Sequence, residues 1–222
     1  NFPIVADGAS GMRFGKHSKK NYISNFATLV RSEYFLKYYD PEIILQFGGS
    51  PTSNVVLEFF KNSKAKKFLI NEYGDKNDPS LTAKKIIKSD PTEFCKMMIS
   101  IFDNKKLVIN KKWFRELVFF DREIESIKRI KMNKGLMIYE SKVIFELFEL
   151  LPSNIDVMVS NSLPIRDLDF FASINQKDIR VFCNRGASGI DGIISTALGI
   201  AKSSKRPTVL LTGDLAFFHD MN

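Results

Sequence analysis

The sequence predicts an α/β protein built on parallel sheets, and three observations support this prediction. Short apolar segments recur along the 222-residue chain. Stretches in which apolar residues have helical spacing separate these segments. The two kinds of segment alternate through both halves of the chain, which is typical of parallel strands joined by helices that cover the faces of the sheet.

The first half, residues 1–110, is predicted to be a Rossmann-like α/β domain. Its strand candidates are residues 3–6, 43–47, 67–71 and 86–88. Its helix candidates are residues 26–38, 53–61 and 91–102. Asp90 can cap the last helix, since Pro91 takes the first helical position and Glu93 lies three residues after the cap. The half contains no clean G-x-G-x-x-G, so a structural role for the turn at residues 48–51 is favoured over cofactor binding.

Residues 111–135 are predicted to form a helical connector. The segment is strongly charged and contains the only tryptophan. Its apolar residues lie on one helical stripe, and they are Trp113, Leu117, Phe120, Ile124 and Ile127. The segment MNKG at residues 132–135 then ends the helix.

Residues 136–222 are predicted to form a second α/β unit. A helix with apolar residues from Val143 to Leu151 ends at Pro152. Strands are then expected at residues 155–160, 180–183 and 207–212. Helices are expected from near Ser162 and over residues 188–202, and a further helix begins after Asp214. Since the chain starts on a predicted strand and stops within this helix, we expect a piece of a longer polypeptide.

Composition excludes several classes of protein. Hydrophobic residues make up 44% and charged residues 26%, which argues against a disordered chain, a collagen-like repeat and a small disulfide scaffold. No apolar run approaches the roughly 20 residues needed to cross a bilayer, and the N-terminus has no signal-peptide pattern. The two cysteines, Cys95 and Cys183, are isolated in apolar surroundings, which favours buried thiols in a reducing compartment. We expect a cytoplasmic protein without stable membrane insertion.

The charge of the chain is positive. It has 33 basic and 25 acidic residues, for a formal charge of +8. Such a balance suits nucleic acid, an anionic surface or anionic substrates. The lysine clusters lie at predicted turns and element ends, with little aromatic interleaving and no nucleic-acid motif. We therefore expect solvated lysines and no nucleic-acid partner.

Three loops that follow predicted strands of the second half are rich in functional side chains. Ligands of open α/β sheets bind outside the carboxyl ends of the strands, so these loops form the candidate site. Their candidate residues are Ser162, Arg166, Asp167 and Asp169 in the first loop, Asn184, Arg185, Gly186, Ser188, Gly189, Asp191 and Gly192 in the second, and Gly213, Asp214, His219 and Asp220 in the third.

The residue types in these loops suit an anionic cofactor, a metal and a carboxylate substrate. Asp214 follows a buried strand, where its carboxylate can bridge a hard cation to phosphate oxygens. The glycine before it lets the backbone approach closely, and the helix that follows offers free N–H groups to an anion. Arg166 and Arg185 present planar guanidinium groups suited to carboxylates.

Each signal taken alone has an ordinary structural interpretation. A Gly-Asp pair after a strand is more often a turn or a helix cap. Asp167 and Asp169 beside Arg166 can form a surface ion pair that contributes little. His219 is expected on a helix surface or in the core rather than as a catalytic base.

The order and combination of the motifs resemble one family. NSLPIRDLD, NRGASGIDGIISTALGIA and PTVLLTGDLAFFHDMN in the second half, with ADGASGMRFG, FGGSPTSNVVLEF and NEYGDKNDP in the first, are similar to 2-succinyl-5-enolpyruvyl-6-hydroxy-3-cyclohexene-1-carboxylate synthases. These are thiamine-diphosphate enzymes of menaquinone biosynthesis. The resemblance implies that residues 1–110 are the central domain and that residues 136–222 are the truncated start of the thiamine-diphosphate-binding domain.

The resemblance also implies an activity. The family is a Mg²⁺-dependent transferase (carboligase) that decarboxylates 2-oxoglutarate and adds the succinyl-semialdehyde unit to isochorismate, and its members are homodimers or homotetramers. One alternative is another thiamine-diphosphate carboligase of the acetohydroxyacid-synthase type, although the paired arginines argue against a pyruvate site. The other alternative is a non-catalytic Rossmann-like nucleotide-binding module.

Site residues follow from the resemblance. Asp214 would be a Mg²⁺ ligand, and Ile190 would be the bulky apolar residue that bends the cofactor. The other cofactor-binding positions would be Gly186, Gly213 and Leu215. The substrate-binding positions would be Ser162, Arg166 and Arg185.

The chain departs from the usual pattern in three places. Leu215 replaces the second glycine of the common Gly-Asp-Gly, as it does in this family. A second metal ligand, an asparagine, would lie beyond Asn222, and the glutamate that activates the cofactor would lie in a preceding domain. We therefore expect no catalytic residue among these 222 and no turnover by the chain alone, and whether it binds the cofactor stays open.

Overall fold

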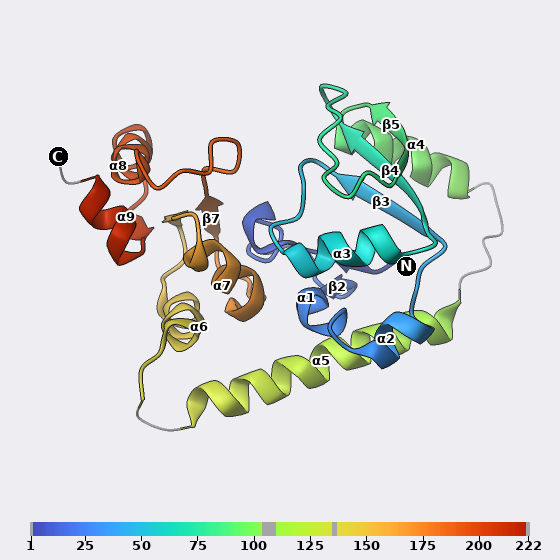
Figure 1. Ribbon diagram of the computed structural model, residues 1–222, viewed down its shortest axis with the longest axis horizontal. Helices are drawn as coiled ribbons and strands as arrows, with labels where there is room; N and C mark the ends of the chain where they lie inside the picture. Colours follow the sequence, from blue (N-terminus) through green and yellow to red (C-terminus); the bar gives the residue numbers. More distant parts are fainter. Residues whose placement is uncertain (1, 104–109, 135–136, 221–222) are drawn as a thin grey trace. The chain divides into compact units, whose positions relative to one another are not determined.

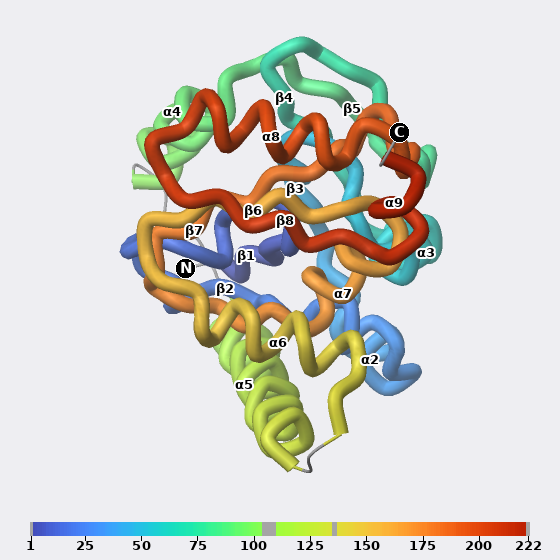
Figure 2. Tube along the Cα trace, turned by 90° about the vertical axis from the view of Figure 1, so that its left-hand side faces the viewer, coloured from blue at the N-terminus to red at the C-terminus, as the bar shows by residue number. Residues whose placement is uncertain are grey.

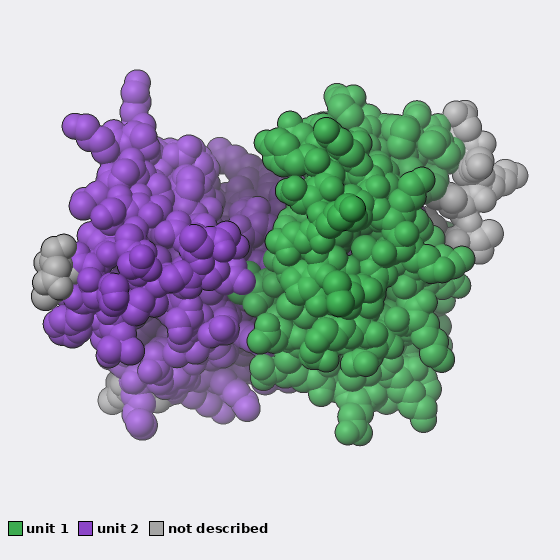
Figure 3. Space-filling view, turned by 45° about the horizontal axis from the view of Figure 1, so that its top comes forward, with its two compact units in different colours: residues 1, 27–116 green, residues 2–26, 117–222 purple. Residues whose placement is uncertain are grey.

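The structure is a computed structural model that describes residues 2–103, 110–134 and 137–220. Strands and helices alternate along the chain, and the strands pair in parallel, which confirms the predicted α/β class (Figure 1). The described residues divide into two compact units (Figure 3). Residues 27–103 and 110–116 form unit 1, and residues 2–26, 117–134 and 137–220 form unit 2. No helix in the described ranges is long and apolar enough to cross a membrane.

Unit 1 contains a three-stranded parallel sheet in the order β3-β4-β5. Its elements are α1 (Phe26–Leu29, which begins at the unit boundary), α2 (Glu33–Tyr38), β3 (Ile43–Phe47), α3 (Asn54–Asn62), β4 (Lys66–Asn71), β5 (Ala83–Lys88) and α4 (Pro91–Asp103). The sheet carries the predicted strands at 43–47, 67–71 and 86–88, with β5 three residues longer at its start. Helix α4 packs on the sheet through the Phe94 ring, whose centroid lies 5.8 Å from that of Phe47 on β3.

The single helix predicted over residues 26–38 is wrong, because the chain forms two short helices there. Ser32 between them has extended backbone angles, and its hydroxyl accepts a hydrogen bond from Phe35 N at 3.4 Å. Serine is favoured at this capping position because its side chain satisfies an N–H that the first helical turn leaves free. The apolar stripe continues across Ser32, so the sequence pattern did not show that a second helix begins there.

A buried ion pair fastens the loop after β4 to the sheet of unit 1. Lys67 is only 1% exposed, and its Nζ lies 2.6 Å from Asp78 Oδ1 and 4.7 Å from the centre of the Phe60 ring. The Asp78 carboxylate also accepts hydrogen bonds from backbone N–H groups of Ser80, Thr82 and Ala83. Burial alone would raise the pKa of Asp78, but hydrogen bonds from the Lys67 ammonium, the Ser80 hydroxyl and Ala83 N, together with the Lys67 charge, lower it to about 2.

Because of this ion pair, we expect the free energy of unfolding to fall in acid. Because the pKa of Asp78 is about 2 in the folded chain and 3.8 ordinarily, its contribution is complete above about pH 5. The contribution, about 2 kcal/mol, disappears as the pH falls through 4 towards 2. Urea unfolding between pH 7 and pH 2 should show this loss in the parent and in the Asp75→Asn control, which removes an exposed carboxylate of the same loop. An Asp78→Asn variant that keeps the full acid dependence would contradict the assignment.

Unit 2 contains a three-stranded parallel sheet in the order β7-β6-β8. Its elements are β1 (Ile4–Val5), the 3-10 helix η1 (Gly8–Ser10), β2 (Tyr22–Ile23), α6 (Glu140–Leu150), β6 (Ile155–Val159), α7 (Leu163–Phe171), β7 (Ile179–Phe182), α8 (Ile193–Ser203), β8 (Thr208–Leu211) and α9 (Asp214–His219). Helix α5 (Lys111–Asn133) contains the boundary between the units and belongs to unit 2 from Leu117 onwards.

Side-chain alternation along β6 explains how helices cover both faces of this sheet. All five residues of β6 are buried. Val157 and Val159 point into a core with residues of α6 and α7, whereas Met158 packs with Ile193 and Ala197 of α8. Successive strand residues face opposite sides, so α6 and α7 cover one face and α8 covers the other (Figure 2).

Residues 2–26 pack with the second sheet rather than with the first. The Phe14 ring stacks on Phe148 of α6, with centroids 5.2 Å apart, and lies in the core of β6 and α7. β1 pairs in parallel with β2, a two-residue strand too short for the sequence pattern to indicate. The compact units thus divide differently from the expected boundaries at residues 110 and 135, and the identities of the domains stay predictions.

A buried guanidinium holds this segment to α7. Arg13, 2% exposed, lies 2.7 Å from Asp169 Oδ1 and donates to the carbonyl oxygens of Ala6, Asp169 and Ala172. Gly8 N donates to the same Asp169 oxygen at 2.9 Å. A Cβ on Gly8 would lie 2.9 Å from Asp169 Cα, so only glycine permits this approach.

Two smaller expectations are also corrected. The helix predicted over 188–202 begins at Ile193, because Gly192 has φ +72° and breaks the helical path before it. Both cysteines are free as expected, but Cys95 is exposed rather than buried, and Cys183 is half-buried.

Candidate functional site

The order of the second sheet creates a candidate binding crevice. The chain runs from the central strand β6 to β7 on one side and then crosses to β8 on the other. In open α/β sheets, ligands bind outside the carboxyl ends of the strands at such a switch point. Residues 160–162 after β6 and 212–214 after β8 lie at this edge of the sheet, which we call the candidate crevice.

Hydrogen bonds join the three strand-end loops. Ser160 N donates to Leu211 O at 2.8 Å, which continues the pairing of β6 with β8 to the ends of both strands. Asn161 Nδ2 donates to Gly189 O at 2.7 Å and links the first loop to the second. The Asp220 carboxylate accepts from Gly192 N and Ile194 N, both at 2.6 Å, and links the second loop to α9. Three segments far apart in sequence thus meet at one edge of the sheet.

The predicted site side chains are mostly open to solvent. Ile190 and Gly213 are half-buried, and the exposed ones are Ser162, Arg166, Arg185, Gly186, Asp214 and Leu215. Asp214 begins α9, and its Oδ1 accepts from Leu215 N at 2.8 Å. Within the described ranges Arg166, Arg185 and Asp214 form no ion pair with one another or with other residues. Their charges are therefore not neutralised by the fold.

Ser162 has a strained backbone at the start of α7. Its angles are φ +70° and ψ −127°, a region that residues with a Cβ seldom occupy. Such strain costs on the order of 1–3 kcal/mol and persists where the surrounding structure imposes it. The strain fixes the direction in which the chain leaves β6, one turn before Arg166.

Glycine at this position should relieve the strain. We expect Ser162→Gly to raise the free energy of unfolding by about 1 kcal/mol, measured by urea denaturation. Ser126→Gly on the exposed face of α5 is the matched control, because glycine in a helix interior destabilises by about 1 kcal/mol. Equal destabilisation by the two glycines would contradict the strained geometry.

Two buried polar atoms beside the crevice lack partners. Ser160 Oγ and Asn161 Oδ1 are buried, and neither forms a hydrogen bond within the described part of the chain. A buried polar atom without a partner costs about 1–3 kcal/mol, so such atoms usually bond to water or a ligand. Their position at the end of β6 fits a polar group held in the crevice.

The residues present fit one part of a metal site. No cluster of three or more His, Cys, Asp or Glu suited to a metal occurs among the described residues. Asp214 alone offers a carboxylate. Mg²⁺ commonly takes one or two protein carboxylates and completes its shell with water and phosphate oxygens. Asp214 is therefore suited to a metal that arrives with a phosphorylated ligand.

The acidic residues of the first loop differ from expectation. Asp169 does not form a surface pair with Arg166, since it lies buried against Arg13. Asp167 is buried as well, and burial raises the pKa of its carboxyl. His219 is exposed on α9, which is the helix-surface position expected for it rather than the core position. Asp220 has a linking role that the sequence did not indicate, because its partners lie 26 and 28 residues earlier.

Internal hydrogen bonds hold the turn at residues 48–51 in unit 1. Gly48 has φ +74°, which favours glycine, and its N–H donates to Ile70 O at 3.0 Å. Gln46 Nε2 donates to Gly49 O at 2.9 Å. The backbone conformation of Gly48 and these two bonds fit the structural role predicted for the turn.

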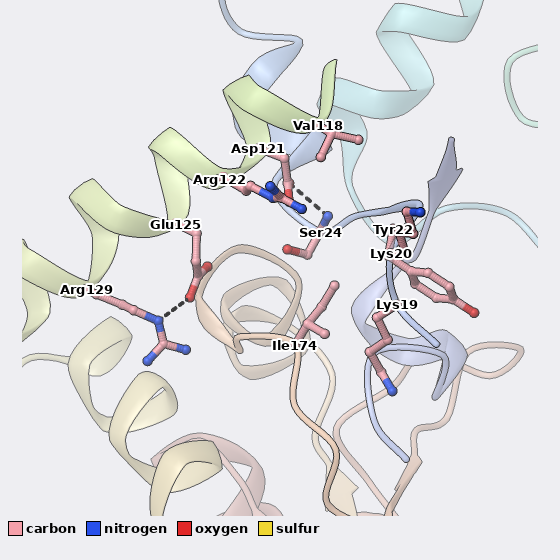
Figure 4. Close-up of a pocket in the computed structure, with 10 residues that line it drawn as sticks. All are labelled: Lys19, Lys20, Tyr22, Ser24, Val118, Asp121, Arg122, Glu125, Arg129 and Ile174. Atoms are coloured by element: carbon pink, nitrogen blue, oxygen red, sulfur yellow. Dashed lines mark hydrogen bonds and ion pairs between the residues drawn. The ribbon is translucent and has the colours of Figure 1, made fainter. Parts of the chain in front are cut away.

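A separate hollow of about 240 Å³ lies in unit 2 beside α5 (Figure 4). Its lining residues are Lys19, Lys20, Tyr22, Ser24, Val118, Asp121, Arg122, Glu125, Arg129 and Ile174. The acids in it are bonded within the fold: Asp121 Oδ1 accepts from Ser24 N at 2.9 Å, and Glu125 Oε1 lies 2.8 Å from Arg129 Nε. These contacts hold α5 against residues 24–25. We therefore interpret the hollow as a result of helix packing and not as a binding site.

Comparison with known proteins gives one consistent result. No family model matches the chain. All of the chain aligns at 35% identity over 223 residues with a protein of Bacillus cytotoxicus named 2-succinyl-5-enolpyruvyl-6-hydroxy-3-cyclohexene-1-carboxylate synthase. Proteins of the same name from Geobacillus thermodenitrificans and Haloarcula marismortui are 35% and 31% identical, again over the whole chain. The chain spans 37% of the length of each of these three relatives. Along its whole length, the chain is therefore a relative of one part of the 2-succinyl-5-enolpyruvyl-6-hydroxy-3-cyclohexene-1-carboxylate synthases.

Proposed function

We propose that the chain is the central domain and the beginning of the thiamine-diphosphate-binding domain of such a synthase. The complete protein would be a cytoplasmic homo-oligomer that decarboxylates 2-oxoglutarate and adds the succinyl-semialdehyde unit to isochorismate. The observation that carries the proposal is the meeting of three strand-end loops at a sheet switch point. These loops carry an unpaired carboxylate and two unpaired guanidinium groups among the described residues.

In this proposal, the third loop holds the diphosphate and the metal. Asp214 would ligate Mg²⁺, and main-chain groups of Gly213 and Leu215 would face the phosphate oxygens. In the structure Leu215 N donates to Asp214 Oδ1 at 2.8 Å, so this N–H would turn to a phosphate oxygen only when the Asp214 carboxylate turns to the metal. When bound, thiamine diphosphate supplies a carbon nucleophile and an electron sink that allow a 2-oxoacid to lose CO₂.

The second loop would position the rest of the cofactor. Gly186 offers open main chain, since no atom lies within 4 Å of the position a Cβ would take there. Ile190 would pack against the cofactor and keep it in its bent conformation. Its half-buried side chain is bulky and apolar, which suits contact with an aromatic ring.

The substrates would be bound through their carboxylates by Ser162, Arg166 and Arg185. Both proposed substrates are dicarboxylates, so a site for them needs fixed positive charge. A guanidinium group can donate two parallel hydrogen bonds to one carboxylate, and it stays charged at any physiological pH. These residues bind and orient. We place no acid or base catalyst among them and expect no turnover by the 222-residue chain alone.

A comparison of donors in the full-length protein tests the proposal. With thiamine diphosphate, Mg²⁺ and isochorismate, we expect product from 2-oxoglutarate at a kcat/KM at least about 10-fold above that with pyruvate, because a lost charge-assisted hydrogen bond costs about 1.5–3 kcal/mol. Arg166→Gln or Arg185→Gln should remove most of this preference. A preference for pyruvate would indicate a carboligase of the acetohydroxyacid-synthase type. Tight binding of NAD or FAD without binding of thiamine diphosphate would indicate a nucleotide-binding module.

A further inference from the structure

The N-terminus of α8 is capped by a residue from another helix. The N-cap of α8 is Gly192, which has no side chain to accept a hydrogen bond. The Asp220 carboxylate, at the end of α9, takes this role with both oxygens. Oδ1 accepts from Gly192 N and Oδ2 from Ile194 N, each at 2.6 Å. Free N–H groups and the positive end of the helix dipole both favour a carboxylate there.

The negative charge of Asp220 stabilises this contact in addition to its geometry. The hydrogen bonds from Gly192 and Ile194 hold the pKa of Asp220 below its ordinary value, so the carboxylate is ionised at neutral pH. Gly192 has φ +72°, a conformation that turns its N–H towards this acceptor without a Cβ penalty. The contact between Asp220 and Gly192 therefore fixes the end of α9 to the start of α8.

The contact connects the two elements that carry the proposed cofactor site. Helix α9 begins with Asp214, and the loop before α8 contains Arg185, Gly186 and Ile190. Asn161 Nδ2 holds the same loop from its other side through Gly189 O, at 2.7 Å. The loop is thus attached both to the end of β6 and to the residue that follows α9.

We infer that Asp220 is a positioning residue that sets the loop at residues 185–190 in register with Asp214. The inference rests on the proposed function, since it concerns where that loop stands relative to a bound cofactor. Asp220 does not itself touch the cofactor in this assignment. It acts through the two backbone N–H groups, and its removal should loosen the loop and weaken cofactor binding together.

The test uses the full-length synthase with Asp220→Ala and Asp220→Asn. His219→Gln is the matched control, because it changes the exposed neighbour at the same helix end. Hydrogen exchange of the Gly192 and Ile194 amides is measured without cofactor. The dissociation constant of thiamine diphosphate with Mg²⁺, kcat and the KM for 2-oxoglutarate are measured as well.

We expect Asp220→Ala to speed exchange at both amides by about 10-fold or more and to raise the cofactor dissociation constant by about 10-fold, as loss of one charge-assisted hydrogen bond does. Asp220→Asn should be intermediate, and it decides the test if the alanine variant does not fold. His219→Gln should match the parent. Exchange and cofactor affinity that stay at parental values in both Asp220 variants would overturn the inference while leaving the proposed function intact. Failure of the parent protein to bind thiamine diphosphate would overturn both.

Discussion

Replacing Arg13 by methionine is expected to lower the free energy of unfolding by about 3–5 kcal/mol. The guanidinium is 2% exposed, pairs with a carboxylate that is 4% exposed, and donates to carbonyl oxygens at the end of α7. Methionine keeps much of the side-chain volume but leaves the Asp169 carboxyl buried without its counter-charge. Burial already raises the pKa of that carboxyl, and the Arg13 charge opposes the rise. Urea denaturation at pH 7 measures the loss.

Two further variants separate charge from packing. Arg122→Met makes the same replacement on the exposed face of α5, where we expect a change within about 0.5 kcal/mol. Arg13→Met combined with Asp169→Leu removes both charges and should recover part of the stability, because replacing a buried pair by apolar residues is often close to neutral. An Arg13→Met variant as stable as Arg122→Met would show that the pair does not hold residues 2–26 on the second sheet.

The largest expected functional effect belongs to Asp214. In the full-length protein, and on the proposed function, we expect Asp214→Asn to weaken the binding of thiamine diphosphate with Mg²⁺ by about 100-fold, since even residues that support metal ligands change affinity 10- to 100-fold when replaced. An amide brings a neutral oxygen where the cation requires charge. Titration calorimetry with and without Mg²⁺ measures the change.

A matched carboxylate provides the control for this variant. Asp178 lies just before β7, at the opposite end of the same sheet, and pairs with Arg206 at 2.8 Å. Asp178→Asn should leave cofactor affinity within about twofold, because its loss affects only a partly exposed ion pair. Equal affinities for the parent and the Asp214→Asn variant would exclude Asp214 as a metal ligand.

Local pattern was sufficient for the strand-end loops and for every described strand except the two-residue β2. The segments IILQF and IDVMV are short apolar runs that form β3 and β6 as expected. Arg166, Arg185 and Asp214 follow such runs, and parallel strands place their carboxyl ends at one edge. The positions of these loops therefore follow from element order alone.

Contacts between distant residues could not be predicted in this way. Arg13 and Asp169 are 156 residues apart, and nothing near either one signals the other. Lys67 looks like one member of a surface lysine cluster, yet Asp78 and the Phe60 ring make its burial favourable. Asp220 follows a short helix, and the two N–H groups that it binds lie 26 and 28 residues earlier. Each of these side chains is placed by its partner rather than by its neighbours in sequence.

A crystal structure of the full-length protein with thiamine diphosphate and Mg²⁺ tests the proposed site most directly. We expect the diphosphate outside the carboxyl ends of β6 and β8, with the metal bound by Asp214 and with Arg166 and Arg185 facing the substrate side of the cofactor. A diphosphate bound away from this edge, or a metal held without Asp214, would contradict the proposed site.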